Sequence, residues 1–286
     1  MKIVSHTGMK NRYGDTVSTI ISTTLLLALA FVFLFPLYWM FIAAFQPSSA
    51  AIQIPPNIFP KQFTMNNFEK LFTKTQAVVW LFNSIIVAGM TTILTLIFSS
   101  MSGYVFAKKK FPGRIILFWI LLSAMMAPKQ VMLVPLYIQM NVYNLNDTYA
   151  GMFMPMVAYP LGLFLMRQFM QSIPDDLITA ARIDGAGEFT LFFKIVIPLS
   201  LPAFGAVGIL YFIQTWNDYL WQLIIMDTVS KFTLPVGISL IAKQEFSIDY
   251  GLMMSGAVFG AVPMIVIFMF LQKYFIRGVT VGAIKG

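Results

Sequence analysis

The sequence contains no cysteine, a single histidine and few charged residues. Without thiols the chain can form neither a disulfide bond nor a thiolate metal site, and it has no cysteine nucleophile. The histidine, His6, lies in the polar N-terminal segment, where an exposed side chain without a specific role is the simplest interpretation. Charged residues make up 10% of the chain, whereas soluble domains contain about a quarter. The composition therefore argues against a soluble protein.

Sequence motifs for catalysis are also missing. No glycine-rich loop precedes a Lys-Ser or Lys-Thr pair, so we do not expect the chain to hydrolyse ATP through a P-loop. The sequence has no HExxH zinc motif, no nucleophile elbow and no Cys/His spacing typical of a metal site. We therefore expect a non-catalytic chain without a metal ion or a cofactor of its own.

Long apolar runs dominate what is present. Hydrophobic residues make up 58% of the chain, and the mean hydropathy is +0.79. Each run is long enough for a helix to cross a lipid bilayer, where backbone groups must be paired within the segment. The sequence predicts an all-α integral membrane protein with six transmembrane helices at about 17–45, 78–107, 115–137, 149–166, 199–225 and 251–275. Pro128 and Lys129 predict that the third span is bent or ends early, and Lys129 could face an aqueous cavity.

The net charge of +8 indicates how the chain is oriented in the membrane, because surplus Lys and Arg collect on the cytoplasmic side of membrane proteins. With the N-terminal tail 1–16 in the cytoplasm, thirteen of the nineteen Lys and Arg residues fall on that side. We therefore expect both ends of the chain, including the C-terminal tail 276–286, to be cytoplasmic. The same orientation places the loop between the fourth and fifth spans in the cytoplasm.

That loop is the most charged part of an otherwise apolar chain. Asp175 and Asp176 suit the first turn of a short helix, where the helix dipole favours negative charge. Asp184-Gly185 permits a sharp reversal, because glycine tolerates positive φ. A second helix is expected from about Glu188, with apolar residues at helical spacing: Phe189, Phe192, Phe193 and Val196.

Residues 172–198, which we call the knob, are thus predicted to form a helix-turn-helix protrusion between two spans. An amphipathic segment that lies flat on the bilayer surface would show the same periodicity. The identity and order of several residues carry more information than the hydrophobic spacing alone. These residues are Ala180-Ala181, Asp184-Gly185-Ala186, Phe193, Ile195, Pro198-Leu199 and Pro202. This order resembles the EAA loop of ABC-importer permeases.

In that family the loop is a coupling helix that docks into a cleft of a separate cytoplasmic ATPase. The resemblance implies a coupling role for Asp176, Thr179, Ala180, Ala181, Arg182, Asp184, Gly185, Ala186 and Glu188. The family usually has a glutamate just before the two alanines, and this chain has Thr179 there.

The run Trp216 to Trp221 places an acid within an apparent span. Aromatic rings can stack on sugars while amide and carboxylate groups bind hydroxyls, which makes Asn217, Asp218, Tyr219 and Trp221 candidates for a translocation path. An aromatic belt at the outer membrane interface is an equally good interpretation. The run looks like the N-D-[FY]-L-W segment of sugar-permease relatives, although Gln222 stands where many of them have proline.

The C-terminal segment 278–286 resembles the terminal G-x-T-x-G-A-x-K-G of MalG-like subunits, which belong to the carbohydrate branch of the family. In that branch the tail reaches between two ATPase subunits, which implies ATPase contacts for Thr280, Gly282 and Lys285. A flexible, disordered end is the alternative from the residues alone. The resemblance also implies that the loop 227–250 meets an extracytoplasmic binding protein, although a solvated connection remains possible.

Together, the resemblance implies a type I ABC-importer permease fold and a permease subunit in a bacterial inner membrane. It implies as partners a second, related permease, two ATP-binding subunits, a substrate-binding protein, membrane lipid and a carbohydrate such as an oligosaccharide or polyol, but no nucleic acid. ATP and Mg would be bound by the ATPase. An ion-coupled secondary transporter is the rival class, and it should show several intramembrane carboxylates and an inverted repeat.

Overall fold

A computed structural model of the chain describes residues 12–283 except 52, 54–57, 242, 245 and 246. Helices make up nearly all of the regular structure, and two short strands pair as an antiparallel hairpin. The elements in chain order are α1 Arg12–Ala44, α2 Ser48–Ala51, α3 Asn66–Lys74, α4 Ala77–Lys108, α5 Arg114–Ser123, η1 Ala124–Met126, α6 Lys129–Val142, α7 Tyr149–Val157, α8 Leu161–Gln171, α9 Asp175–Ile183, α10 Glu188–Leu191, η2 Phe192–Val196, α11 Ile197–Leu199, α12 Leu201–Trp216, α13 Leu220–Ile225, η3 Val229–Lys231, α14 Leu234–Ile241, β1 Lys243–Gln244, β2 Ser247–Ile248 and α15 Tyr250–Ala283.

Three helical stretches are long and apolar enough to cross a membrane unaided: Ser18–Ala44, Ala77–Lys108 and Tyr250–Phe270. Three more candidate spans are broken pairs, with bends of 102° between α5–η1 and α6, 44° between α7 and α8, and 75° between α10–α11 and α12. The bend before α6 falls at Pro128, because proline lacks the amide proton that a continuous helix requires.

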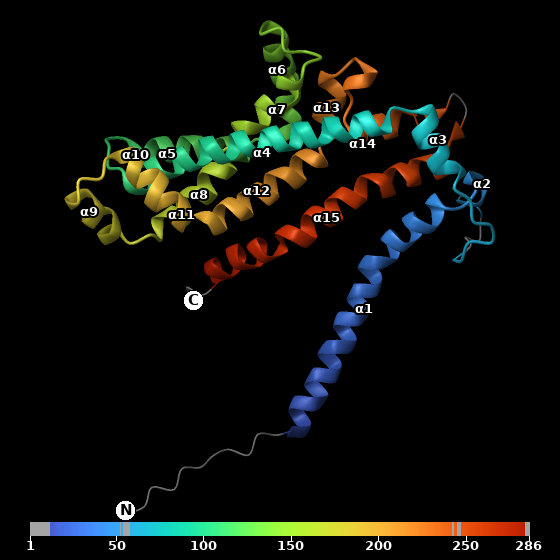
Figure 1. Cartoon of the computed structure of the whole chain (residues 1–286), viewed down its shortest axis with the longest axis horizontal. Coiled ribbons are helices and arrows are strands. Elements are labelled where there is room, and N and C mark those ends of the chain that lie inside the picture. Colours follow the sequence, from blue (N-terminus) through green and yellow to red (C-terminus); the bar gives the residue numbers. More distant parts are fainter. Residues whose placement is uncertain (1–11, 52, 54–57, 242, 245–246, 284–286) are drawn as a thin grey trace, which may run out of the picture.

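Helix α4 lies at the centre of the bundle. It packs along α8 and α12, and α12 packs in turn against α15. The knob helices α9 and α10 lie at one end of the bundle, and α2, α3 and α14 lie near the other end (Figure 1). The two ends of the bundle are therefore built from different parts of the chain.

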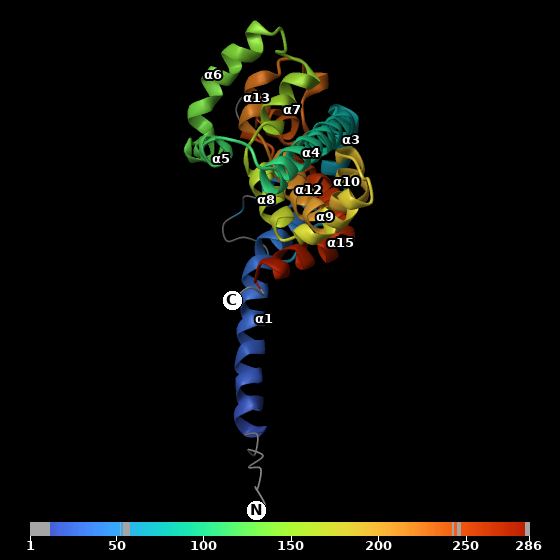
Figure 2. The same ribbon diagram turned by 90° about the vertical axis from the view of Figure 1, so that its left-hand side faces the viewer.

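Helix α1 diverges from this bundle (Figures 1 and 2). Its C-terminal end is fixed to the bundle, where Ala43 and Ala44 are buried, but the side chains of residues 18–38 are all exposed. Most of α1 therefore finds no packing partner within the described part of this chain.

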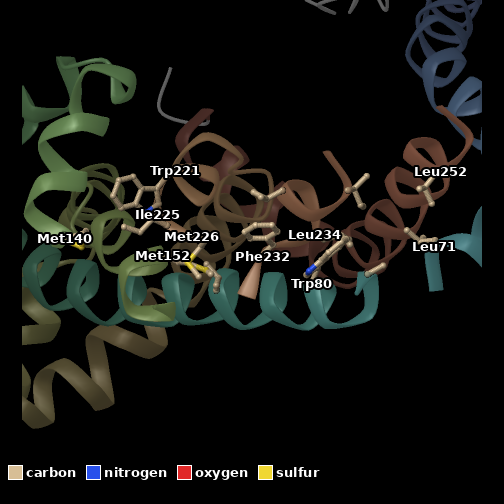
Figure 3. Packing of buried hydrophobic residues seen from close by; sticks show 14 residues of the cluster. Leu71, Trp80, Met140, Met152, Trp221, Ile225, Met226, Phe232, Leu234 and Leu252 are labelled. Carbon is tan, nitrogen blue, oxygen red and sulfur yellow. The ribbon is translucent and has the colours of Figure 1, made fainter. Parts of the chain in front are cut away.

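The larger apolar cluster joins α4 to α7, α13 and α14 (Figure 3). Trp80 and Trp221 are each 1% exposed, and both indole N–H groups donate to backbone carbonyls, Trp80 to Val229 at 2.7 Å and Trp221 to Gly151 at 3.1 Å. Gly237 lies flat on the Trp80 ring, since a Cβ there would come within 2.2 Å of the ring. These contacts hold the end of the bundle opposite the knob.

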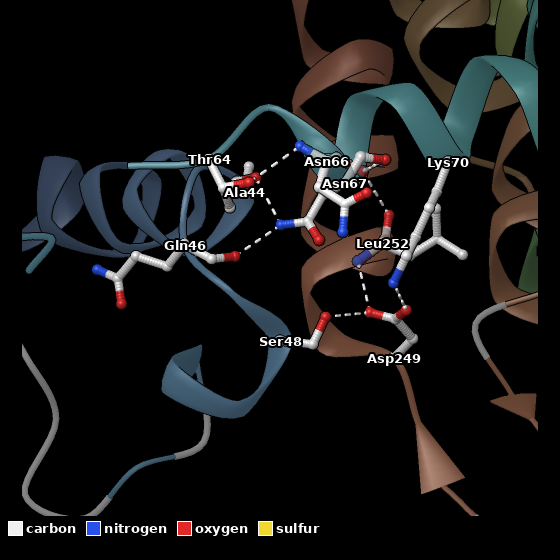
Figure 4. Close-up of polar contacts among 10 residues, drawn as sticks. Ala44, Gln46, Ser48, Thr64, Asn66, Asn67, Lys70, Asp249 and Leu252 are labelled. Atoms are coloured by element: carbon white, nitrogen blue, oxygen red, sulfur yellow. Dashed lines mark hydrogen bonds and ion pairs between the residues drawn. The ribbon is translucent and has the colours of Figure 1, made fainter. Parts of the chain in front are cut away.

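A polar cluster at that same end joins the end of α1 to the start of α15 (Figure 4). Asn67, which is buried, donates to the carbonyls of Ala44 and Gln46. The carboxylate of Asp249 accepts hydrogen bonds from Ser48 at 2.5 Å and from the backbone N–H of Leu252 at 3.0 Å, and it also pairs with Lys70. Burial raises the pKa of Asp249, but these donors outweigh it and leave the pKa below its ordinary value.

Candidate functional site: the knob

The first helix of the knob, α9, begins where the sequence places negative charge. Asp175 and Asp176 occupy its first turn, and the helix ends at Ile183. Gly185 then has φ of +85°, the left-handed conformation that turns the chain toward α10 at no steric cost. The predicted reversal at Asp184-Gly185 is therefore present in the structure.

Two lysines at the end of α4 clamp the knob. The Lys108 ammonium, whose side chain is 4% exposed, donates to the Ile173 carbonyl at 2.5 Å and to the Asp175 carboxylate at 2.7 Å. That hydrogen bond and the charge of Lys108 hold the pKa of Asp175 below its ordinary value. Lys109 forms an ion pair with Glu188, so α4 grips both helices of the knob.

Glu188 is the meeting point of these contacts. Its carboxylate also accepts a hydrogen bond from the Tyr104 hydroxyl at 2.9 Å and pairs with Arg182 at 3.2 Å. Arg182 and Glu188 were expected to contact an ATPase, and the structure brings them together within the knob itself. Sequence reasoning missed Tyr104, Lys108 and Lys109, because each of them contacts a part of the knob that lies far away in the sequence.

The second helix of the knob is not a simple α-helix. After α10 the chain forms one π-helical turn, η2, in which Phe192 and Val196 are buried against Tyr104, Met166 and Met170. Phe189 and Phe193 are instead 79% and 58% exposed. The predicted apolar face is therefore buried on one half, at Phe192 and Val196, and exposed on the other half.

The outer surface of the knob is unusually apolar for a charged segment. Ile183 is 82% exposed and lies beside the Asp184-Gly185 turn, and Leu177 is also exposed. The other predicted coupling residues, Asp176, Thr179, Ala180, Asp184 and Gly185, are exposed, and Ala181 and Ala186 are partly so. The Thr179 hydroxyl donates to the Asp175 carbonyl at 3.0 Å, so it is satisfied within α9. The knob thus combines a rigid attachment with an uncovered apolar surface.

The residues predicted for a translocation path lie where α12 ends rather than inside a continuous span. Helix α12 stops at Trp216, and Asn217, Asp218 and Tyr219 form a break before α13. Asn217 is exposed, whereas the Oδ2 atom of Asp218 is buried without a hydrogen-bond partner among the described residues. Trp221 is 1% exposed and packs in the core, where it also lines one of the two cavities described next.

Two cavities flank this break. One, of about 570 Å³, is lined by Trp216, Asn217 and Ser239 together with small residues of α15. The other, of about 450 Å³, lies beside Lys129, whose ammonium is 4.9 Å from the centre of the Tyr159 ring. The structure therefore places the Asn217 amide at one mostly apolar cavity and the Lys129 ammonium at the other.

The described part of the C-terminal tail is helical, which differs from the flexible end that the residues alone offered as an alternative. Helix α15 continues to Ala283, so Thr280 and Gly282 lie within a helix and not in a flexible end. No proline follows Pro263 to stop the helix, and the apolar span continues directly into the tail. Lys285 lies outside the described residues.

Comparison with known proteins agrees with this architecture. The family described as "Binding-protein-dependent transport system inner membrane component" matches residues 97–281. A solved structure, that of a bacterial ABC transporter involved in the import of the acidic polysaccharide alginate, contains a chain with the same fold. It has a TM-score of 0.81 at 23% sequence identity, with 94% of this chain and 100% of that chain covered.

Relatives in sequence cover almost the whole chain. The arabinooligosaccharides transport system permease protein AraQ of Bacillus subtilis (strain 168) is 40% identical over 267 residues, which is 92% of this chain and 95% of that protein. The sn-glycerol-3-phosphate transport system permease protein UgpE of Yersinia pestis bv. Antiqua (strain Antiqua) is 32% identical over 252 residues, 86% of this chain and 90% of that protein. This chain therefore belongs to the family of inner membrane components of binding-protein-dependent ABC transport systems.

Proposed function

We propose that this chain is one of two permease subunits of an ATP-driven importer that moves a carbohydrate across a bacterial inner membrane. An extracytoplasmic binding protein delivers the substrate, and a separate ATPase pair supplies the energy. The relatives named for arabinooligosaccharides and for sn-glycerol-3-phosphate support a small sugar or polyol derivative as cargo. Both chain ends lie in the cytoplasm in this proposal, in agreement with the distribution of Lys and Arg.

The observation that carries the proposal is the clamped, uncovered knob. Protein interfaces depend on a few large apolar residues surrounded by polar groups. Ile183 and Phe189 are 82% and 79% exposed, and each is adjacent in the chain to an acidic residue, Asp184 or Glu188. Ion pairs with Lys108 and Lys109 fix the knob to the end of α4, which favours a protrusion built for docking over a segment that lies flat on lipid. We infer that the ATPase covers this surface.

Coupling then requires no reactive side chain in this chain. ATP and Mg are bound by the ATPase subunits, and closure of those subunits moves the docked knob. A ligand shifts a two-state equilibrium only by its differential affinity for the two states. The ATPase therefore has to grip the knob differently in its open and closed forms.

The other partners follow from the exposed parts of the bundle. The unpacked face of α1 suits contact with the second permease as well as with lipid, and the loop 227–250 faces the binding protein. Asn217, Asp218 and Tyr219 lie along the substrate path beside the cavities described above. Trp221 lines the second of these cavities and packs in the core beside α7.

The test is an ATPase assay of the reconstituted complex with its binding protein and a panel of arabinooligosaccharides, glycerol phosphates and acidic oligosaccharides. We expect one chemical class to stimulate hydrolysis. A complex that purifies without an ATPase, or a transport rate that follows an ion gradient and not ATP, would contradict the proposal.

A further inference from the structure

Helix α4 is the one candidate span, among those in the described part of the chain, that has neither a break nor an internal proline. Helices α1 and α15 contain Pro36 and Pro263, and the other three candidate spans are bent pairs. The 32 residues of α4 form an unbroken helix, and at about 1.5 Å per residue it is roughly 48 Å long. It is therefore long enough and stiff enough to connect the two faces of a membrane.

One end of α4 holds the loop that follows α13. The buried Asn83 amide donates to the carbonyls of Ser230 and Phe232, both at 2.9 Å, and its Oδ1 atom accepts from the Tyr149 hydroxyl at 2.7 Å. Trp80, about one turn before Asn83, donates to the Val229 carbonyl. Ser84, the residue after Asn83, accepts a hydrogen bond from the backbone N–H of Leu234 through its hydroxyl at 2.8 Å. These contacts fix η3 and the start of α14 on α4.

The other end of α4 holds the knob. Tyr104, Lys108 and Lys109 contact Glu188, Asp175 and the Ile173 carbonyl, as described above. Side chains of a single helix thus grip the two segments that the proposed function assigns to opposite partners. Rigid secondary elements are one of the physical carriers of coupling between distant sites.

We propose that α4 is a connecting rod that transmits docking of the binding protein on the segment from η3 to the start of α14 to the knob, with Asn83 and Lys108 as its two positioning residues. This inference rests on the proposed function, which supplies the partners at each end. It goes beyond that function because it assigns the connection to one helix and to identified contacts.

Each end of the rod can be released by one substitution. Asn83→Leu keeps a similar volume and removes the hydrogen bonds to the loop, and Lys108→Met keeps a long side chain and removes both contacts to the knob. Matched controls are Val79→Ala, which lies one turn before Asn83 and is 44% exposed, and Lys110→Met, which carries the same charge change two residues beyond Lys108. Ser84→Ala gives a second, milder release of the loop if Asn83→Leu does not assemble.

The measurement is the ratio of ATPase rates of the full complex with and without arabinooligosaccharide-loaded binding protein. We expect each releasing variant to lower this ratio about tenfold, a size typical of coupling between sites, while the controls leave the ratio unchanged. A double variant, Asn83→Leu with Lys108→Met, should be no worse than the poorer single variant, because one released end already disconnects the rod.

Multiplied losses in the double variant would mean that the two ends act independently, and they would overturn the inference. Single variants that keep the wild-type ratio would overturn it as well. Absence of stimulation in the wild-type complex, across the whole sugar panel, would instead contradict the proposed function.

Discussion

At the scale of single residues, Gly185 controls the direction of the knob. Nothing lies within 4 Å of a Cβ built on it, so a larger residue there meets no neighbour and only its φ of +85° is strained. A β-branched residue pays roughly 1–3 kcal/mol for such a conformation. The reversal therefore depends on backbone freedom and not on packing.

We predict that Gly185→Val abolishes most sugar uptake while the protein still inserts into the membrane. Uptake of labelled sugar by cells that express equal amounts of the complex is the measurement. Gly187→Ala is the control, because Gly187 also has open space but a φ of −73° that any residue adopts. Normal uptake by Gly185→Val would count against a role for the knob geometry.

Asp147 is a second residue with a backbone conformation of this kind, at φ of 54°. Its carboxylate accepts hydrogen bonds from the backbone N–H groups of Asp227 and Thr228, from the Thr228 hydroxyl and from Lys231. Burial raises the pKa of Asp147, but these donors outweigh it and hold the pKa well below its ordinary value. Asp147 thereby ties the turn before α7 to the loop that α4 also holds.

The depressed pKa sets the pH dependence of this contact. A carboxylate with a lower pKa in the folded state stabilises the protein fully above its unfolded pKa of about 3.9, and the contribution disappears as the pH falls through the folded value. We predict that Asp147→Asn, which tolerates the same φ, lowers the thermal unfolding midpoint of the complex equally at pH 7 and pH 5. The difference should shrink only below about pH 4. A difference that already disappears near pH 6 would show that another group controls it.

At the scale of elements, the contact between α4 and α8 depends on small residues. A Cβ on Gly103 would lie 2.7 Å from the Cβ of Met166 and 3.0 Å from the backbone nitrogen of Arg167. A Cβ on Gly162 would lie 2.3 Å from the Ser99 hydroxyl oxygen. The two helices therefore pack with their backbones close together, as small residues permit in membranes.

Gly103→Ala should force α4 and α8 apart. We expect a loss of about 1–3 kcal/mol in stability, the usual cost of inserting an atom into a packed core, seen as a lower thermal midpoint of the purified complex. Gly208→Ala on α12 is the control, because its nearest neighbour on α4, the Leu96 side chain, is 3.5 Å away. Equal midpoints for the two variants would mean that α4 and α8 have room to adjust.

Sequence reasoning located the helical runs and the two helices of the knob because their signals are local. Asp175 in a first turn, Gly185 at a reversal and Pro128 at a bend each act within a few residues. The π-helical turn η2 has no comparable signature in the sequence. The pattern also did not show that Phe192 and Val196 are buried while Phe189 and Phe193 are exposed, because all four share one helical face.

Contacts between distant segments could not be predicted in this way. Lys108 and Asp175 meet only because α4 and α8 lie side by side, and Asn83 reaches Ser230 only after the chain has crossed the bundle several times. The break at Asn217 was missed for another reason: no proline or glycine interrupts the apolar run there, so its composition reads as one continuous span.

At the scale of the whole molecule, the proposed function makes this bundle one half of a pore. The central helix α4 is covered by α8, α12 and the loop before α14. Helix α1 extends away from the bundle (Figure 1), and the apolar side chains of α1 are exposed. A second permease would complete the pore and an ATPase would cover the knob. The account therefore depends most on which side of the membrane the knob occupies and on what binds it there.

The absence of cysteine in the natural sequence makes that question directly measurable. A single Ile183→Cys variant of the full complex can be treated with a membrane-impermeant maleimide in intact spheroplasts and in inside-out vesicles, with Asp227→Cys as the marker for the opposite face. The account predicts that Ile183→Cys reacts only in inside-out vesicles, and only after the ATPase subunits have been stripped off. Reaction of Ile183→Cys in intact spheroplasts, or equal reaction with and without the ATPase, would contradict it.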